Sequence, residues 1–256
     1  MKSKKFWFSR RQFVCSASLA AASLILAPWQ LKADVPVMLR KTIPGTGESL
    51  PVIGLGSWLT FDVDTDAPVI AEFVKLIEDF FARGGELIDS SPMYGAAEQV
   101  IGLLLNQADM RDRVFAATKV WTDGEQAGIR QMEKSAQQWD IDHFDLMQIH
   151  NLRDWQTHLN TLKAWKAEGK IRYMGITTSH GRSHRELEAI LQQETFDFVQ
   201  LTYNIEDRSV EKRLLPLAAD RGIAVLVNRP YQGGSLFRKV RGKTLPDWVA
   251  EFDCQS

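Results

Sequence analysis

A regular alternation between short apolar runs and longer amphipathic segments limits the folds open to this chain. Apolar residues recur with the period of an α-helix in the longer segments, whereas the short runs are apolar on both faces. Strands of that kind are typical of a parallel sheet covered by helices. Seven such runs begin at Val52, Glu86, Val114, Phe144, Tyr173, Phe196 and Ile223.

Turn residues support this division of the sequence. Gly84 and Gly169 follow amphipathic segments, where glycine commonly ends a helix. Ahead of the first run, residues 39–54 have the pattern of a β-hairpin with Pro44 and Gly45 in the turn. A hydrophobic content of 45% is enough for one sizeable core. We therefore expect one domain over residues 34–256.

Three polar residues stand at the carboxyl ends of consecutive runs: Asp89, Lys119 and His150. A doubly wound sheet and a (β/α)8 barrel both fit the alternation, but in a barrel these ends share one rim, where barrel active sites lie. No GxGxxG motif follows the first run, which offers only Gly54 and Gly56 and so disfavours a Rossmann domain. The pattern thus favours an α/β fold of the TIM-barrel type.

The spacing of four polar residues is similar to that of the aldo-keto reductase family. The family has an aspartate, a tyrosine five positions later, and a lysine and a histidine on the next two strands. Asp89, Tyr94, Lys119 and His150 match this order. The resemblance covers about residues 38–256. It implies the reduction of aldehydes or ketones by hydride transfer, with these four as catalytic residues and Tyr94 as the general acid.

The four residue types suit this chemistry. Hydride transfer builds negative charge on the carbonyl oxygen, so a proton donor must lie within hydrogen-bond reach. A phenol has a pKa of about 10, and a nearby ammonium makes its anion less costly. Lys119 would supply that charge, Asp89 would keep the buried amine protonated, and His150 would orient the carbonyl. Each residue taken alone also has a structural explanation, as a turn residue, a half-buried aromatic, a solvent-reaching lysine or a core histidine.

The resemblance also implies a nicotinamide cofactor, usually NADPH, with NADH as the open alternative. The implied cofactor contacts are Thr177, Thr178, Gln200, Asn228, Arg229, Gly233 and Gly234. Two of them depart from the family pattern. Thr178 replaces an asparagine and makes fewer hydrogen bonds, and Asn228 stands where an aromatic residue often stacks on the nicotinamide. Gly233 and Gly234 would let a diphosphate approach the backbone, although the glycine content of this segment by itself also fits an ordinary surface turn. Arg238 is a further phosphate candidate.

Two tryptophans and two histidines complete the candidate site residues. Trp58 and Trp121 would form the walls of the substrate pocket with Tyr94, although both also fit a core. His180 and His184 are four residues apart and could bind a metal from one helix face. A glycine between them indicates a loop, and no third ligand is evident, so we predict no metal site.

Residues 1–33 have the layout of an export signal. Basic residues precede a small-residue apolar run, and the first acidic residue is Asp34. The string "SRRQF" from Ser9 to Phe13 resembles a twin-arginine signal, which directs folded proteins across the bacterial inner membrane. We therefore expect a periplasmic protein that contacts the export machinery transiently. The alternative is an uncleaved membrane anchor, but the apolar run is shorter than the roughly 20 residues that a spanning helix needs.

Charge and cysteine content narrow the possible partners. Cleavage after Ala33 would leave 25 basic and 32 acidic residues, a net charge of −7. That balance disfavours a nucleic-acid partner. The resemblance implies a small carbonyl compound as the ligand. Only Cys254 would remain in the mature chain, so no internal disulfide is expected. The sequence does not indicate an oligomeric state.

The C-terminal end departs from the family pattern. A full family barrel has an eighth strand and helix, which hold the adenosine 2′-phosphate, whereas this sequence ends in what reads as a helix beginning after Pro246. We expect a C-terminally incomplete barrel without the eighth strand and helix, or one whose gap a partner chain closes. Two functions stay open: a carbonyl reductase, and a non-catalytic or vestigial barrel that serves as a binding or regulatory module and cannot hold cofactor. A barrel enzyme for a phosphorylated ligand is a third, weaker alternative.

Overall fold

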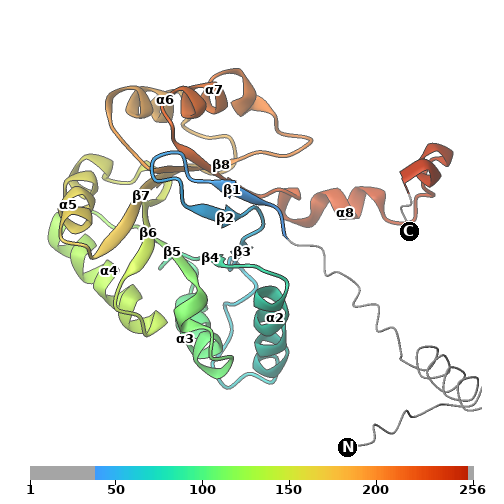
Figure 1. Ribbon diagram of the computed structural model, residues 1–256, viewed down its shortest axis with the longest axis horizontal. Helices are drawn as coiled ribbons and strands as arrows, with labels where there is room; N and C mark the ends of the chain where they lie inside the picture. The colour runs from blue at the N-terminus through green and yellow to red at the C-terminus, as the bar shows by residue number, and fades with distance from the viewer. Residues whose placement is uncertain (1–37, 253–256) are drawn as a thin grey trace, which may run out of the picture. The chain divides into compact units, whose positions relative to one another are not determined.

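The computed structural model describes residues 38–252, which are built around a curved sheet of seven parallel strands (Figure 1). The strand order follows the sequence, β3-β4-β5-β6-β7-β8-β9, and every neighbouring pair is parallel. The strands are β3 (Leu55–Gly56), β4 (Leu87–Asp89), β5 (Phe115–Val120), β6 (Phe144–Ile149), β7 (Ile171–Thr177), β8 (Phe198–Thr202) and β9 (Ala224–Asn228). Each of the seven predicted runs therefore contributes one strand.

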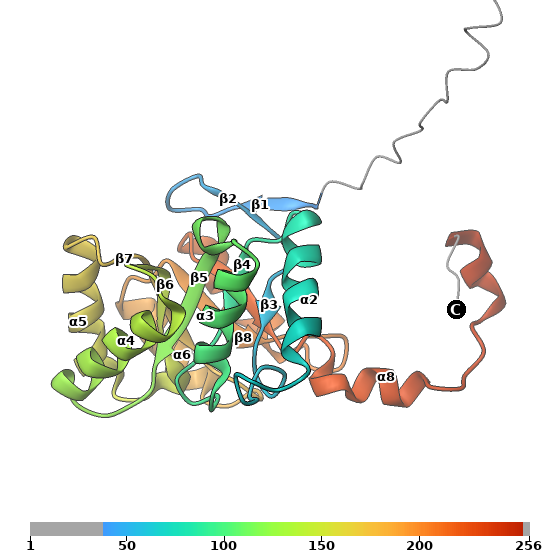
Figure 2. The same cartoon turned by 90° about the horizontal axis from the view of Figure 1, so that it is seen from below.

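Helices join successive strands and cover the outer face of the sheet (Figures 1 and 2). They are α2 (Ile70–Ala82), α3 (Ala97–Gln107), α4 (Glu125–Trp139), α5 (Trp155–Ala167), α6 (His184–Gln193), α7 (Leu214–Asp220) and, after β9, α8 (Ser235–Val240). Short 3-10 turns are η1 (Arg111–Arg113), η2 (His150–Leu152), η3 (Ser209–Lys212), η4 (Gln232–Gly234) and η5 (Asp247–Phe252). The helix expected after Pro246 is thus the 3-10 turn η5. The arrangement is that of a TIM barrel without its eighth strand.

A hairpin closes the end of the sheet where the strands begin. Strands β1 (Arg40–Thr42) and β2 (Ser49–Pro51) pair antiparallel, as predicted. Ile43 and Leu50 of the hairpin are buried in one apolar cluster with inward side chains of the sheet. The Thr46 and Tyr173 hydroxyls lie 2.9 Å apart and tie the hairpin to β7. Because this end is filled, the carboxyl ends of the strands are left to form the site.

The main core lies between the sheet and its helices. Side chains from α3 and α4 pack there against the outward residues of β5 and β6, with Leu104, Met132 and Trp139 fully buried. Gly102 of α3 allows the two helices to approach closely, because an added Cβ would lie 2.0 Å from the carbonyl oxygen of Gln138. This outer layer holds the strands in register beneath the site.

The predicted export signal of residues 1–33 lies outside the described residues, as does Cys254. Among the helices of residues 38–252, none combines the length and the apolar character needed to cross a membrane.

Candidate active site

Inward side chains of the sheet change from apolar to polar towards the carboxyl ends of the strands. Alternate residues of a strand face the same side, so each inward polar residue follows an inward apolar residue two positions earlier. Leu87, Ala117, Leu146 and Phe198 belong to the inner apolar cluster, and the residues two positions later are Asp89, Lys119, Gln148 and Gln200. Four polar side chains from β4, β5, β6 and β8 therefore form one layer at the mouth of the sheet.

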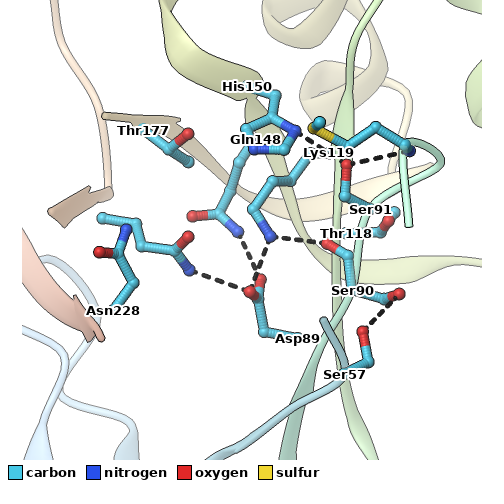
Figure 3. Close-up of polar contacts among 12 residues, drawn as sticks. Ser57, Asp89, Ser90, Ser91, Thr118, Lys119, Gln148, His150, Thr177 and Asn228 are labelled. Carbon is cyan, nitrogen blue, oxygen red and sulfur yellow. Dashed lines mark hydrogen bonds and ion pairs between the residues drawn. The ribbon is translucent and has the colours of Figure 1, made fainter. Parts of the chain in front are cut away.

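Asp89 is the centre of this layer (Figure 3). Its carboxylate accepts hydrogen bonds from Lys119 Nζ at 2.7 Å, from Gln148 Nε2 at 2.9 Å and from Gln200 Nε2 at 3.1 Å. Lys119 also donates to the backbone oxygen of Ser90 at 2.6 Å. The Lys119 side chain is fully buried, and a buried charge is tolerated only when it is paired and hydrogen-bonded. Asp89 and Lys119 therefore form a buried ion pair.

Tyr94 lies in the turn between β4 and α3, over this pair. The Lys119 Nζ atom is 5.4 Å from the centre of the Tyr94 ring. Burial raises the pKa of the Tyr94 phenol above its ordinary value, and Asp89 adds to this rise, while the charge of Lys119 opposes it. The expected effect of Lys119 is therefore present, but burial outweighs it. Tyr94 is a protonated hydrogen-bond donor near neutral pH.

His150 follows β6 and is buried beside Tyr94. The two rings meet edge to face with centres 5.8 Å apart, and the Nδ1 atom of His150 is 2.8 Å from the hydroxyl of Ser91 (Figure 3). Burial and the nearby charge of Lys119 lower the pKa of His150 to about 3. The imidazole is neutral at physiological pH, so it carries one N–H group and no positive charge.

The two predicted tryptophans lie in different places. Trp121 follows β5, and its ring centre is 6.5 Å from that of His150. The backbone N–H and C=O of Trp121 are bonded to the Gln131 side chain, and Arg153 stacks on its ring at 4.8 Å. Trp58 is half exposed and lies against Arg229, 6.0 Å from its guanidinium carbon. Trp121 is thus a fixed aromatic wall beside His150, whereas Trp58 borders the β9 side.

The residues implied to hold the nicotinamide lie at the ends of β7, β8 and β9. Thr177 accepts a hydrogen bond from the backbone N–H of Asn151 at 3.0 Å. Asn228 donates to the backbone oxygen of Thr178 at 2.9 Å and accepts from Thr202 at 2.6 Å. One N–H of the Gln200 amide is bonded to Asp89, so its carbonyl oxygen and its second N–H are left for a ligand.

The glycine pair after β9 forms a turn bordered by arginines. Gly233 and Gly234 have φ angles of +61° and +82°, a region that glycine adopts without strain. A Cβ added at Gly233 would lie 3.6 Å from an Arg229 nitrogen, and one at Gly234 would lie 3.6 Å from an Arg238 nitrogen. A backbone without side chains between two guanidinium groups fits the phosphates of a dinucleotide.

The two histidines considered as metal ligands do not share a helix face. His180 lies in a loop with a φ angle of +61° and its Nε2 atom is 2.6 Å from Arg229 Nη1, whereas His184 begins α6. Within residues 38–252, no cluster of three or more potential metal-ligating side chains occurs. His180 instead belongs to the basic loops on the β9 side of the site.

Sequence reasoning missed two residues of the site, Gln148 and Ser91. Gln148 could have been found, since it is an inward polar residue in an apolar run, two positions before His150. Gly175 makes room for it, because an added Cβ there would lie 2.9 Å from Gln148 Cγ. Asp89 can only accept, so the Gln148 amide nitrogen faces it, and the carbonyl oxygen is buried without a partner in residues 38–252. Ser91 gave no signal, because its contact with His150 depends on the fold.

Fold and site together define a TIM-barrel protein with a buried cluster of ionisable side chains at the strand ends. A model of the aldo/keto reductase family matches residues 52–248. The chain therefore belongs to the aldo/keto reductase family.

Curated relatives support this assignment. An aldo-keto reductase of Bacillus subtilis, YhdN, is 28% identical over 231 residues, which cover 83% of this chain and 66% of the relative. An NADH-specific methylglyoxal reductase of Escherichia coli is 31% identical over 235 residues, covering 77% of this chain and 69% of that protein. The chain thus spans about two thirds of the length of the curated relatives that it matches.

Solved structures of the family share the fold. An aldo-keto reductase of Klebsiella pneumoniae in complex with NADPH aligns with a TM-score of 0.67 at 26% identity, covering 81% of this chain and 74% of the other. A second Klebsiella pneumoniae structure, with NADP and acetate, aligns with a TM-score of 0.65 at 25% identity and covers 78% and 70%. These alignments agree with the barrel expected from the sequence.

Proposed function

We propose that this protein reduces aldehydes or ketones with a reduced nicotinamide cofactor and that Tyr94 is its general acid. The observation that carries the proposal is the position of Lys119, which is bonded to Asp89 and lies under the Tyr94 ring. An amine held in this way is suited to stabilise a phenolate as it forms. His150, beside Tyr94, supplies a second donor for the same substrate oxygen.

The residues present fit a dinucleotide. Gly233, Gly234 and Arg229 would hold the diphosphate, and Thr177 with the Gln200 carbonyl oxygen would hold the carboxamide. NADPH is the expected cofactor, since a related structure contains it, and NADH stays open because the Escherichia coli relative is NADH-specific. When bound, the cofactor supplies the hydride.

The chain's own residues complete the reduction. The substrate carbonyl oxygen would lie between the Tyr94 hydroxyl and the His150 N–H group, with Trp121 beside the substrate. Two donors at this oxygen stabilise the negative charge that develops during reduction. Tyr94 then transfers its proton to the oxygen, Lys119 stabilises the phenolate, and Asp89 keeps Lys119 charged.

The rival is a barrel that keeps the fold but holds no cofactor and serves as a binding or regulatory module. One observation favours it: the amide N–H of Gln200 is already bonded to Asp89, which leaves this residue one group fewer for the carboxamide. The enzyme proposal accounts for more, because a binding module has no need of a buried lysine under a tyrosine.

Titration with NADPH and with NADH, followed by fluorescence, separates the two functions. We expect binding, together with cofactor oxidation that depends on methylglyoxal or another small carbonyl compound. Tyr94→Phe keeps the ring and removes the proton, so kcat should fall about 10²–10⁴-fold while cofactor binding persists. Absence of binding by a well-folded chain would support the rival, and equal activity of Tyr94→Phe would exclude Tyr94 as the acid.

A further inference from the structure

Ser91 lies behind His150 and has no part in the predicted catalytic set. Its side chain is fully buried in the turn after β4. The hydroxyl oxygen is 2.8 Å from His150 Nδ1 and accepts a longer hydrogen bond, 3.4 Å, from the backbone N–H of Met93 (Figure 3). These are the only hydrogen bonds of the Ser91 hydroxyl within residues 38–252. Ser91 therefore contacts the imidazole on one of its two nitrogens.

The orientation of the His150 ring follows from this contact. If the ring were turned over, a carbon atom would take the place of Nδ1 at hydrogen-bond distance from the Ser91 oxygen. Nδ1 therefore faces Ser91, and Nε2 lies across the ring. Nε2 makes no hydrogen bond to the described part of the chain, so it is the nitrogen available to a ligand.

The single proton of the imidazole can be assigned by counting donors and acceptors. Burial and Lys119 hold the pKa of His150 near 3, so only one ring nitrogen is protonated at neutral pH. The Met93 N–H can only donate, which leaves the Ser91 hydroxyl proton for Nδ1. With the proton on Nδ1 instead, the buried hydroxyl proton would have no acceptor within residues 38–252, which costs free energy. The contacts therefore favour the tautomer with the proton on Nε2.

We propose that Ser91 is a positioning residue that keeps the imidazole proton of His150 on Nε2. The proposal deepens the proposed function and rests on it for its consequence. An N–H at Nε2 donates to the substrate oxygen, whereas a lone pair there would repel it. Ser91 does not touch the substrate, and it acts only through His150.

Nitrogen NMR of the histidine side chains tests the tautomer without substrate or cofactor. We expect the full chain, labelled with ¹⁵N at its five histidines, to show His150 protonated on Nε2 at pH 7. In Ser91→Ala the Nδ1-protonated form should become populated. Ser57→Ala is the matched control, because it removes an equally buried hydroxyl that donates to Ser90 and not to His150. Protonated Nδ1 in the unmodified chain, or an unchanged tautomer in Ser91→Ala, would overturn the proposal.

Kinetics give the second measurement. Ser91→Ala should lower kcat about tenfold, a change of about 1.4 kcal/mol in the barrier, with little change in the KM for NADPH. Ser91→Thr keeps the hydroxyl and should restore kcat, and Ser91→Cys, a weaker donor, serves if the threonine is too large for the chain to fold. Unaltered kcat in Ser91→Ala would contradict the proposed role. If the unmodified chain shows no reductase activity, the proposed function fails, and the NMR spectra still decide the tautomer.

Discussion

Glu98 is a further buried ionisable group, on the outer face of the sheet. Its carboxylate accepts hydrogen bonds from Thr118 at 2.5 Å and from Ser135 at 2.8 Å, between β5 and the helices α3 and α4. Burial raises the pKa of Glu98 above its ordinary value, although both hydroxyls and the charge of Lys119 act in the opposite direction. The folded protein therefore binds a proton at Glu98 more tightly than the unfolded chain does.

This difference gives stability a definite dependence on pH. Below the pKa of the unfolded chain, about 4.3, the contribution of Glu98 is fully present, and it is lost as the pH rises towards the raised folded value. Glu98→Gln has the same shape and no charge. We expect the difference in free energy of unfolding, Glu98→Gln minus the unmodified chain, to increase between pH 4 and pH 7. The increase should be about 1.4 kcal/mol for each unit by which folding raises the pKa of Glu98.

Denaturant unfolding of both proteins across this pH range is the measurement. The difference between the two curves isolates Glu98, because every other titrating group is shared. A difference that does not change with pH would show that Glu98 has the same pKa in the folded and unfolded chains.

Helix α3 begins directly after the turn that carries Tyr94, and its N-terminus is capped by a side chain from another part of the sequence. Ala96 stands at its N-terminus, where no local side chain caps the helix. Instead, the carboxylate of Asp62, from the loop between β3 and α2, accepts the Ala96 N–H at 2.9 Å. Gly95, between Tyr94 and Ala96 in the sequence, must lack a side chain, because an added Cβ would lie 2.0 Å from an Asp62 oxygen. Asp62 therefore stabilises the helix and holds the Tyr94 turn in place.

Asp62→Ala should lower the free energy of unfolding by about 1 kcal/mol, as the loss of a helix cap does. It should also lower kcat, because Tyr94 would be held less firmly over Lys119. Asp62→Asn is the control, since its amide oxygen can still accept from Ala96, and it should retain most of the stability. Equal stability of Asp62→Ala and the unmodified chain, measured by denaturant unfolding, would refute the capping role.

The sheet as a whole has two open edges within residues 38–252, at β3 and β9. β9 is only half-buried, and Val227 is 43% exposed. The site does not depend on pairing at these edges, because Asp89, Lys119 and Gln148 come from β4, β5 and β6 in the interior of the sheet. The polar layer around Asp89 is therefore held by paired strands, whereas the arginine-bordered turn follows the edge strand β9.

We also propose that the molecule is exported as a folded unit, as the twin-arginine-like string of residues 9–13 indicates. Fractionation of bacterial cells that express the full chain should recover it from the periplasm. Arg10→Lys combined with Arg11→Lys keeps the positive charge and removes the arginine pair, so this variant should stay in the cytoplasm. Export of both proteins alike would argue against the twin-arginine route, and retention of the unmodified chain in the membrane fraction would favour an anchor.

Much of the architecture could be predicted because its signals are local. The seven strands, the hairpin and the placing of Asp89, Lys119 and His150 at strand ends follow from the alternation of apolar runs and turn residues. Gln148 could have been predicted in the same way, since the alternation of side chains along a strand places it inward beside Lys119. The contact of Trp58 with Arg229 was less predictable, because the two residues are far apart in the sequence.

The sequence by itself determined the order of strands and helices and the residue types at the mouth of the sheet, since hydrophobic periodicity is a property of neighbouring residues. Tertiary structure alone decided which of these residues touch. Asp89 gained two amide donors besides Lys119, and His150 gained Ser91, because the curvature of the sheet brings residues 59 to 111 positions apart within hydrogen-bond distance. Burial then set the protonation of Tyr94 and His150, and burial exists only in the folded chain.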